Sequence, residues 1–278
     1  MTVLTPLTRT QLLNFFDNDA INVINYFIKK TVFAQPEMRE WQEIQAIQIT
    51  KEHLEQWVVQ ALWIEWIWAW SYPVDVIDRN NHWAADVKML HANIDENWLL
   101  TNEESWEASL WQKFRWAGVN LDQLFANQQY ETIKNEWLDI YKEKNQLAIN
   151  EQQLNNIYYF IFLRWWNFLY LVWMKVNLPE LENVTVDYER TSDTSVFINN
   201  FIDDNLWNAK VYKSKKRLEL RLRPWNWEHW NYWIKFNFAS LLDNEHINLR
   251  DNVIEWENLN EYGIEKSRII FNRNIRNN

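Results

Sequence analysis

Two neighbouring segments of the chain carry two acids and a lysine at spacings that suit metal-assisted hydrolysis. The β-type run 72–78 contains Asp75, and the β-type run 84–94, which follows a polar turn cluster, contains Asp86 and Lys88. Because alternate residues of a strand share one face, Asp86 and Lys88 should project together, and a hairpin would bring Asp75 to the same spot. Two carboxylates can bind Mg²⁺ and polarise a phosphodiester, while an ammonium group orients the attacking water. The pattern therefore predicts phosphodiester hydrolysis centred on these three side chains.

The same residues carry a resemblance to a known group of enzymes. Pro73-Val-Asp75 followed by Asp86-Val-Lys88 resembles the motif of the PD-(D/E)XK nuclease superfamily, with the expected short gap between the two halves. The match departs from the motif in one place, since Val74 separates the proline from the acid. The resemblance covers roughly residues 50 to 176. It implies a core of helix, strand hairpin, strand, helix and strand.

The resemblance also implies how the site is composed. Asp75 and Asp86 would bind a magnesium ion, and Lys88 would be the catalytic lysine beside them. In such proteins the first helix often supplies a further acid that is both catalytic and a metal ligand. Glu65 is the first candidate for this acid and Glu55 the second.

A chain of 278 residues with additions at both ends of such a core is most similar to a type II restriction endonuclease. The resemblance then implies a homodimer that cuts a short palindrome in double-stranded DNA, because a two-fold site mirrors a two-fold protein. A structure-specific or repair nuclease of the same superfamily is the alternative. We expect Mg²⁺ as cofactor, no nucleotide cofactor and no membrane partner. The richest apolar stretch, 58–70, is shorter than the about 20 residues that cross a bilayer.

Hydrophobic periodicity predicts an α/β (α+β) fold with a central mixed sheet flanked by helices. The expected helices span residues 8–30, 51–64 and 121–146, and the expected strands 72–78, 84–94, 157–164, 168–176 and 209–222. The polar stretch 177–206 is interpreted as a loop or linker, and Asp78, which precedes further polar residues, as a turn residue. We divide the chain into a helical N-terminal segment (1–50), a catalytic nuclease core (51–176) and a C-terminal β-rich extension (177–278).

A basic cluster in the extension reverses the charge of a chain whose net charge is −10. Its candidate contacts to DNA phosphates are Lys213, Lys215, Lys216, Arg217, Arg221 and Arg223. Alternation should send Arg217, Glu219 and Arg221 to one face of a strand and the intervening leucines to the other. An ordinary solvated strand face explains the same charges equally well. Candidate base-reading residues in the loop after the hairpin are Gln112, Lys113 and Arg115.

The composition has an unusual balance of glycine and tryptophan. The chain holds 2 Gly and 21 Trp, although glycine ordinarily makes up about 7% of a globular chain. Tryptophans that fall where a turn is expected are Trp83, Trp165, Trp166, Trp225 and Trp227. Our hypothesis is that TGA codons meaning glycine in the source organism have been translated as tryptophan, because turns need the conformational freedom of glycine. The alternative is a genuinely Trp-rich protein, such as a binding module with aromatic platforms for carbohydrates or peptides.

Charge and cysteine usage narrow the remaining function classes. An acidic net charge argues against indiscriminate binding to nucleic acid, which depends on clustered Lys and Arg. The chain contains no cysteine, and its first 20 residues lack the charged start, apolar stretch and cleavage site of a secretory signal. We therefore expect a cytoplasmic protein.

Overall fold

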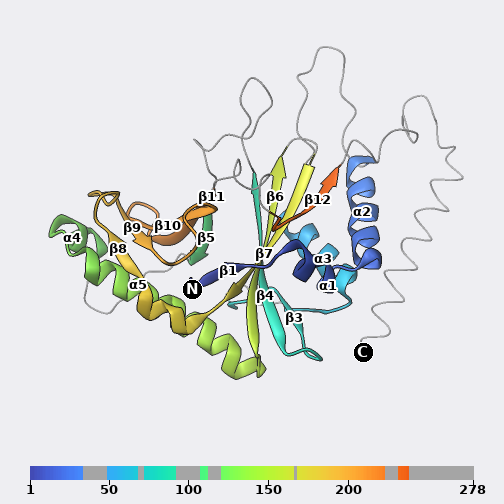
Figure 1. Cartoon of the computed structure of the whole chain (residues 1–278), viewed down its shortest axis with the longest axis horizontal. Coiled ribbons are helices and arrows are strands. Elements are labelled where there is room, and N and C mark those ends of the chain that lie inside the picture. Colours follow the sequence, from blue (N-terminus) through green and yellow to red (C-terminus); the bar gives the residue numbers. More distant parts are fainter. Residues whose placement is uncertain are drawn as a thin grey trace, which may run out of the picture.

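A seven-stranded mixed sheet lies at the centre of the computed structural model (Figure 1). The structure describes residues 1–33, 49–67, 72–91, 107–111, 120–165, 168–222 and 231–237. The strands of this sheet are β1 (Leu4–Pro6), β2 (Glu65–Trp66), β3 (Val76–Asp78), β4 (Trp83–His91), β6 (Asn156–Trp165), β7 (Phe168–Val176) and β12 (Ile234–Asn237). Their order is β1-β7-β6-β4-β3-β2, with β12 also paired to β7. Strands β4 and β6 run parallel and the other described pairs antiparallel. The predicted mixed sheet of an α/β (α+β) chain is confirmed.

The two longest strands of the sheet form from continuous apolar runs. Strands β6 and β7 are rich in aromatic and β-branched residues, which fit a sheet buried on both faces. They pair antiparallel, with Tyr158 opposite Lys175 and Leu163 opposite Tyr170. Both strands were predicted from these runs, and the structure confirms them.

The hairpin of β3 and β4 carries the candidate acids. Val76 pairs with Ala85, which fixes the register of the two strands. The carboxylate of Asp78 accepts hydrogen bonds from the backbone N–H and the side-chain amide of Asn81, at 3.0 and 2.8 Å. Asp78 is therefore a turn residue, as predicted. Residues 92–94 of the predicted second strand lie outside the described residues.

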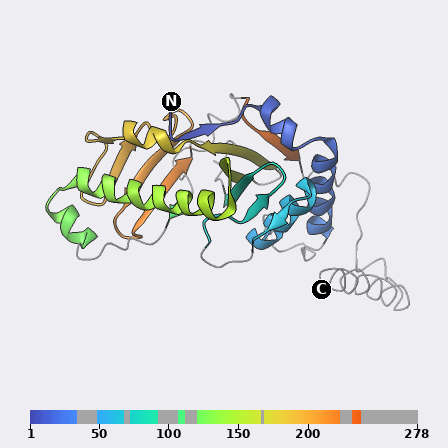
Figure 2. The same ribbon diagram turned by 90° about the horizontal axis from the view of Figure 1, so that it is seen from below.

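Helices cover both faces of this sheet (Figure 2). One face packs against α1 (Arg9–Phe15), α2 (Asn18–Phe33) and α3 (Lys51–Leu62). The other face packs against α5 (Tyr130–Gln152), which follows the short α4 (Leu121–Ala126). The predicted helices are confirmed, although the first and the third are each divided in two. In the described part of the chain, no helix combines the length and apolar character needed to cross a bilayer.

A second sheet of five antiparallel strands lies beside the first (Figure 1). In spatial order its strands are β5 (Glu107–Trp111), β11 (Arg217–Leu222), β10 (Trp207–Tyr212), β9 (Ser195–Asn199) and β8 (Thr185–Asp187). The prediction of a loop or linker over 177–206 is wrong, because this stretch forms a 3-10 helix (Leu178–Asn183) and the strands β8 and β9. The predicted single strand over 209–222 is a hairpin, which turns at residues 213–216.

Polar contacts explain how the stretch 177–206 folds without a strong apolar pattern. The guanidinium group of Arg190 donates hydrogen bonds to Asp187 at 2.5 Å, to Asn208 at 2.7 Å and to Asn199 at 3.0 Å. It also lies 3.3 Å from the carboxylate of Asp204. One side chain thus connects β8, β9, β10 and the turn before β10, and these contacts replace the apolar signal that sequence analysis relies on.

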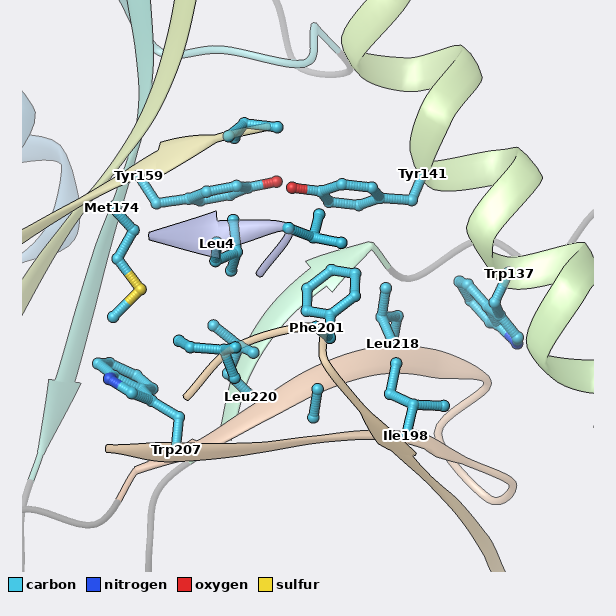
Figure 3. Packing of buried hydrophobic residues seen from close by; sticks show 14 of the residues in the cluster. Leu4, Trp137, Tyr141, Tyr159, Met174, Ile198, Phe201, Trp207, Leu218 and Leu220 are labelled. Atoms are coloured by element: carbon cyan, nitrogen blue, oxygen red, sulfur yellow. The ribbon is translucent and has the colours of Figure 1, made fainter. Parts of the chain in front are cut away.

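Helix α5 connects the two sheets, because it packs against β6 of the first and against β8, β9 and β10 of the second. The core between them contains Trp137 and Tyr141 from α5 together with Ile198, Leu218 and Leu220 from the second sheet (Figure 3). Strands from the predicted N-terminal, core and C-terminal segments lie in the same two sheets. The N-terminal segment adds β1 and the C-terminal segment adds β12 to the first sheet, while β5 joins the second.

The described tryptophans differ in their surroundings. Trp83 and Trp173 are buried and pack together with a centroid distance of 5.8 Å, so the interpretation of Trp83 as a turn residue is wrong. Trp63, by contrast, ends α3 in the left-handed conformation, with φ 54° and ψ 46°, and is 89% exposed. That position ordinarily takes glycine, because a Cβ atom is disfavoured there. The recoding hypothesis stays a prediction, because Gln153 ends α5 in the same left-handed conformation and Trp166, Trp225, Trp227 and the side chain of Trp165 lie outside the described residues.

We expect Trp63→Gly to stabilise the fold by about 1 kcal/mol, because glycine removes the strain of the left-handed conformation. Trp63→Ala should give no such gain, since alanine keeps the Cβ atom. Urea unfolding of the three proteins measures the difference. Trp57→Gly, on the same helix but 4% exposed, should instead destabilise by about 3 kcal/mol or more. Equal stabilities of the glycine and alanine variants at residue 63 would contradict the hypothesis at this position.

Candidate active site

The two aspartates of the β3–β4 hairpin lie side by side. The backbone N–H of Asp75, just before β3, donates to the carbonyl oxygen of Ala85 at 2.9 Å. Its carboxylate oxygen Oδ2 accepts the backbone N–H of Val87 at 2.7 Å. The side chain of Asp75 lies close enough to Asp86 to help lower the pKa of the Asp86 carboxyl. The structure therefore brings these two predicted site residues together on the face of the sheet that packs against α5.

Asp86 is held between two lysines. Its oxygen Oδ1 lies 2.5 Å from Nζ of Lys88, and its oxygen Oδ2 lies 3.3 Å from Nζ of Lys144 on α5. Burial would raise the pKa of the Asp86 carboxyl, but the charges of Lys88 and Lys144, a hydrogen bond from Lys88 and the nearby side chain of Asp75 lower it to about 2. Asp86 is thus a buried carboxylate that stays ionised. Lys88, which is 22% exposed, lies beside it as predicted.

Neutral polar side chains from β6 and α5 line the inner side of this cluster. Tyr159 lies opposite Asp86 on the parallel strand β6, and its hydroxyl faces that of Tyr141 on α5 (Figure 3). Burial raises the pKa of both phenols, and the charge of Asp86 raises that of Tyr159 further. Asn145, buried on the same turn of α5, donates to the backbone carbonyl of Tyr141 at 2.8 Å. These phenols remain protonated at neutral pH and cannot act as charged nucleophiles.

Neither candidate for the further acid joins the aspartate pair. Glu65, on the edge strand β2, forms a salt bridge with Arg79 at 2.8 Å and is 60% exposed. Glu55 belongs to α3 on the opposite face of the sheet, where its carboxylate accepts a hydrogen bond from Nε1 of Trp66 at 3.3 Å. Over the described residues, no three acidic or histidine side chains gather into a group that could hold a metal ion.

The donor set of the aspartate pair nevertheless fits magnesium. The carboxylates of Asp75 and Asp86 lie close together, and the ammonium groups of Lys88 and Lys144 beside Asp86 offset their charge. Mg²⁺ prefers oxygen ligands, and proteins commonly bind it through one or two carboxylates together with water and substrate phosphate. Asp75 and Asp86 supply the two carboxylates of such a site.

Sequence analysis missed Lys144, although a signal for it was present. Trp137, Tyr141, Lys144 and Ala148 follow one another at spacings of four, three and four, which places the lysine on the buried stripe of the helix. A lysine inside an apolar stripe indicates a buried acidic partner, because a buried ammonium group without one is costly. The sequence could not say which acid this was, since Asp86 is 58 residues away.

Part of the basic cluster of the second sheet lies around a buried acid. The alternation of β11 is as expected, but Glu219 on the charged face has no exposed surface. Glu219 lies 2.6 Å from Arg217, 3.2 Å from Lys210 and 3.8 Å from Arg221. Arg217, which is 12% exposed, and Arg221, which is 36% exposed, thus lie beside a buried acid, and their contacts to DNA stay a prediction. The exposed basic residues are Lys215 and Lys216 in the turn, beside the half-exposed Lys213.

The remaining candidates for DNA contacts, Gln112, Lys113, Arg115 and Arg223, lie outside the described residues. Comparisons with protein-family models, with curated proteins and with solved structures found no match to this chain. The function of the site is therefore inferred from the geometry of Asp75, Asp86, Lys88 and Lys144.

Proposed function

We propose that the chain is a Mg²⁺-dependent endonuclease of the PD-(D/E)XK type that cuts double-stranded DNA, and that it acts as a homodimer of the type II restriction kind. The observation that carries the proposal is that the Asp75 carboxylate accepts the backbone N–H of Val87, the residue next to Asp86, while Nζ of Lys88 lies 2.5 Å from Asp86. Further support comes from the order of elements around the site. Helix α3, the hairpin β3–β4, helix α5 and strand β6 follow one another in the order that the resemblance implies, although the strand after the hairpin, β5, lies in the second sheet.

In this proposal each residue of the cluster has a distinct task. Asp75 and Asp86 hold the magnesium ion, which when bound polarises the scissile phosphate and activates a water molecule. The backbone N–H of Val87 fixes the carboxylate of Asp75. Lys88 is partly exposed and long enough to leave Asp86, so that its ammonium group can orient the water and offset the charge that develops on the phosphate. The protonated phenols of Tyr141 and Tyr159 close the inner side of the site.

Cleavage of plasmid DNA tests the proposal directly. Unmethylated plasmid is incubated with the protein of the printed sequence and with a version carrying glycine at Trp63, Trp165, Trp166, Trp225 and Trp227, each with Mg²⁺ or with EDTA. Discrete fragments that require Mg²⁺ support a restriction enzyme, and cuts at branched or damaged sites support a repair nuclease. No metal-dependent cleavage by either version contradicts the proposal, and carbohydrate or peptide binding by such an inactive protein would favour the Trp-rich module.

The turn between β10 and β11 offers a test of DNA contacts. Lys215 is exposed there, so Lys215→Ala should weaken DNA binding by a similar factor for every sequence. If the lysine contacts one phosphate, the slope of log affinity against log salt should fall by about 0.9. Gel shifts at several salt concentrations measure both quantities. Lys175→Ala, an exposed lysine on β7, is the matched control, and equal salt slopes for the two variants would exclude this turn from the DNA interface.

A further inference from the structure

Lys144 is the most deeply buried charge next to the proposed metal ligands. Its side chain is 4% exposed, its ammonium group lies 3.3 Å from Oδ2 of Asp86, and it lies 5.6 Å from the ring centroid of Tyr159. Its neighbours on the same stripe of α5, Tyr141 and Ala148, are fully buried. Lys144 therefore cannot leave Asp86 unless α5 separates from the sheet.

The two lysines of the cluster differ in their freedom to move. Lys88 reaches Asp86 from the same strand and is 22% exposed, so it can turn toward a substrate. Lys144 approaches the other carboxylate oxygen from inside the core. Together the two ammonium groups balance the two carboxylates of Asp75 and Asp86. If a divalent ion displaces Lys88 from Asp86, the other carboxylate oxygen, Oδ2, remains bound to Lys144.

We propose that Lys144 is a positioning residue that acts as a fixed cation at Asp86 and limits the site to one divalent ion per chain. The inference rests on the proposed function, because it takes Asp75 and Asp86 as the metal ligands. Lys144 fixes the orientation of the Asp86 carboxylate, and its charge occupies the side of the carboxylate that a second ion would need. An enzyme built in this way activates water with one ion and Lys88, without a second metal.

Titration calorimetry with Mn²⁺, in the absence of DNA, tests this inference. The unaltered chain should bind one Mn²⁺. Lys144→Gln keeps a hydrogen-bond donor near Asp86 but removes the positive charge, so its Mn²⁺ affinity should rise at least about tenfold, or a second ion should bind. Lys142→Gln, an exposed lysine two residues away on the same helix, should leave affinity and stoichiometry unchanged.

The outcomes separate this inference from the proposed function. Binding of two Mn²⁺ ions by the unaltered chain overturns the inference, and so does unchanged Mn²⁺ binding by a folded Lys144→Gln variant. In either case DNA cleavage by the unaltered chain would leave the proposed function standing. If Lys144→Gln does not fold, Lys144→Arg keeps the charge and should bind one ion with the original affinity, and a second ion there overturns the inference. Absence of both Mn²⁺ binding and cleavage in the unaltered chain overturns the two proposals together.

Discussion

Lys88→Ala is expected to lose DNA cleavage by about 10²-fold to 10³-fold while it retains DNA binding. The ammonium group of Lys88 lies beside Asp86, and in the proposed reaction it stabilises charge that develops only in the transition state. The variant should fold, because Lys144 still neutralises Asp86 after Lys88 is removed. Single-turnover cleavage with Mg²⁺ measures the loss, and gel shifts with EDTA measure binding.

The control for this experiment is Lys142→Ala, which removes an exposed lysine of α5 that contacts neither aspartate in the described structure. It should cleave and bind DNA like the unaltered protein. If Lys88→Ala cuts DNA as fast as the parent, Lys88 is no catalytic residue. The Asp86-Val-Lys88 segment would then be an ordinary polar stretch of a hairpin.

The hairpin illustrates what the sequence could predict about the site. The two-residue period of a strand determines that Asp86 and Lys88 share a face, and the polar residues after Asp78 indicate the turn that returns the chain. Both are local properties, so they can be recognised without knowledge of the rest of the fold. The same holds for the apolar runs that became β6 and β7.

Contacts between distant segments could not be predicted in this way. The stretch 177–206 looked like a linker because Arg190 and its polar partners, which stabilise its strands, carry no apolar period. The burial of Glu219 on β11 could not be predicted for a related reason. Alternation assigns Glu219 to a face, but it does not say what covers that face. For Lys144, local spacing predicts its place on the buried stripe of α5, but its partner Asp86 is distant in the sequence and could not be predicted.

The positions of Glu65 and Glu55 show that the motif alone does not predict whether a further acid lies near Asp75 and Asp86. Glu65 was chosen because related enzymes often supply an acid before the hairpin, yet its carboxylate is engaged by Arg79 at an exposed edge. Within the described residues, the acidic part of the site is therefore the pair Asp75 and Asp86. Loss of either carboxylate should affect this site more than it would affect a site with three acids.

Asp75→Asn is for this reason expected to abolish cleavage through loss of metal binding. Asparagine has nearly the same shape, and its carbonyl oxygen can still accept the N–H of Val87, so the hairpin should keep its register. The neutral amide is a much weaker ligand for a divalent ion than a carboxylate. Removing a group that merely orients a ligand typically lowers metal affinity by 10-fold to 100-fold, so replacing a ligand should cost at least about 10-fold.

Calorimetry with Mn²⁺ measures that loss, and thermal unfolding checks that the fold persists. Asp78→Asn in the same hairpin is the matched control, because its carboxylate binds Asn81 in the turn and not the candidate site. It should bind Mn²⁺ like the parent chain, whereas Asp75→Asn should not. Because the two substitutions remove the same charge from the same hairpin, equal losses of affinity would indicate a general electrostatic effect. Unchanged Mn²⁺ affinity in Asp75→Asn would mean that Asp75 is not a metal ligand, and the proposed magnesium site would then lack one of its two carboxylates.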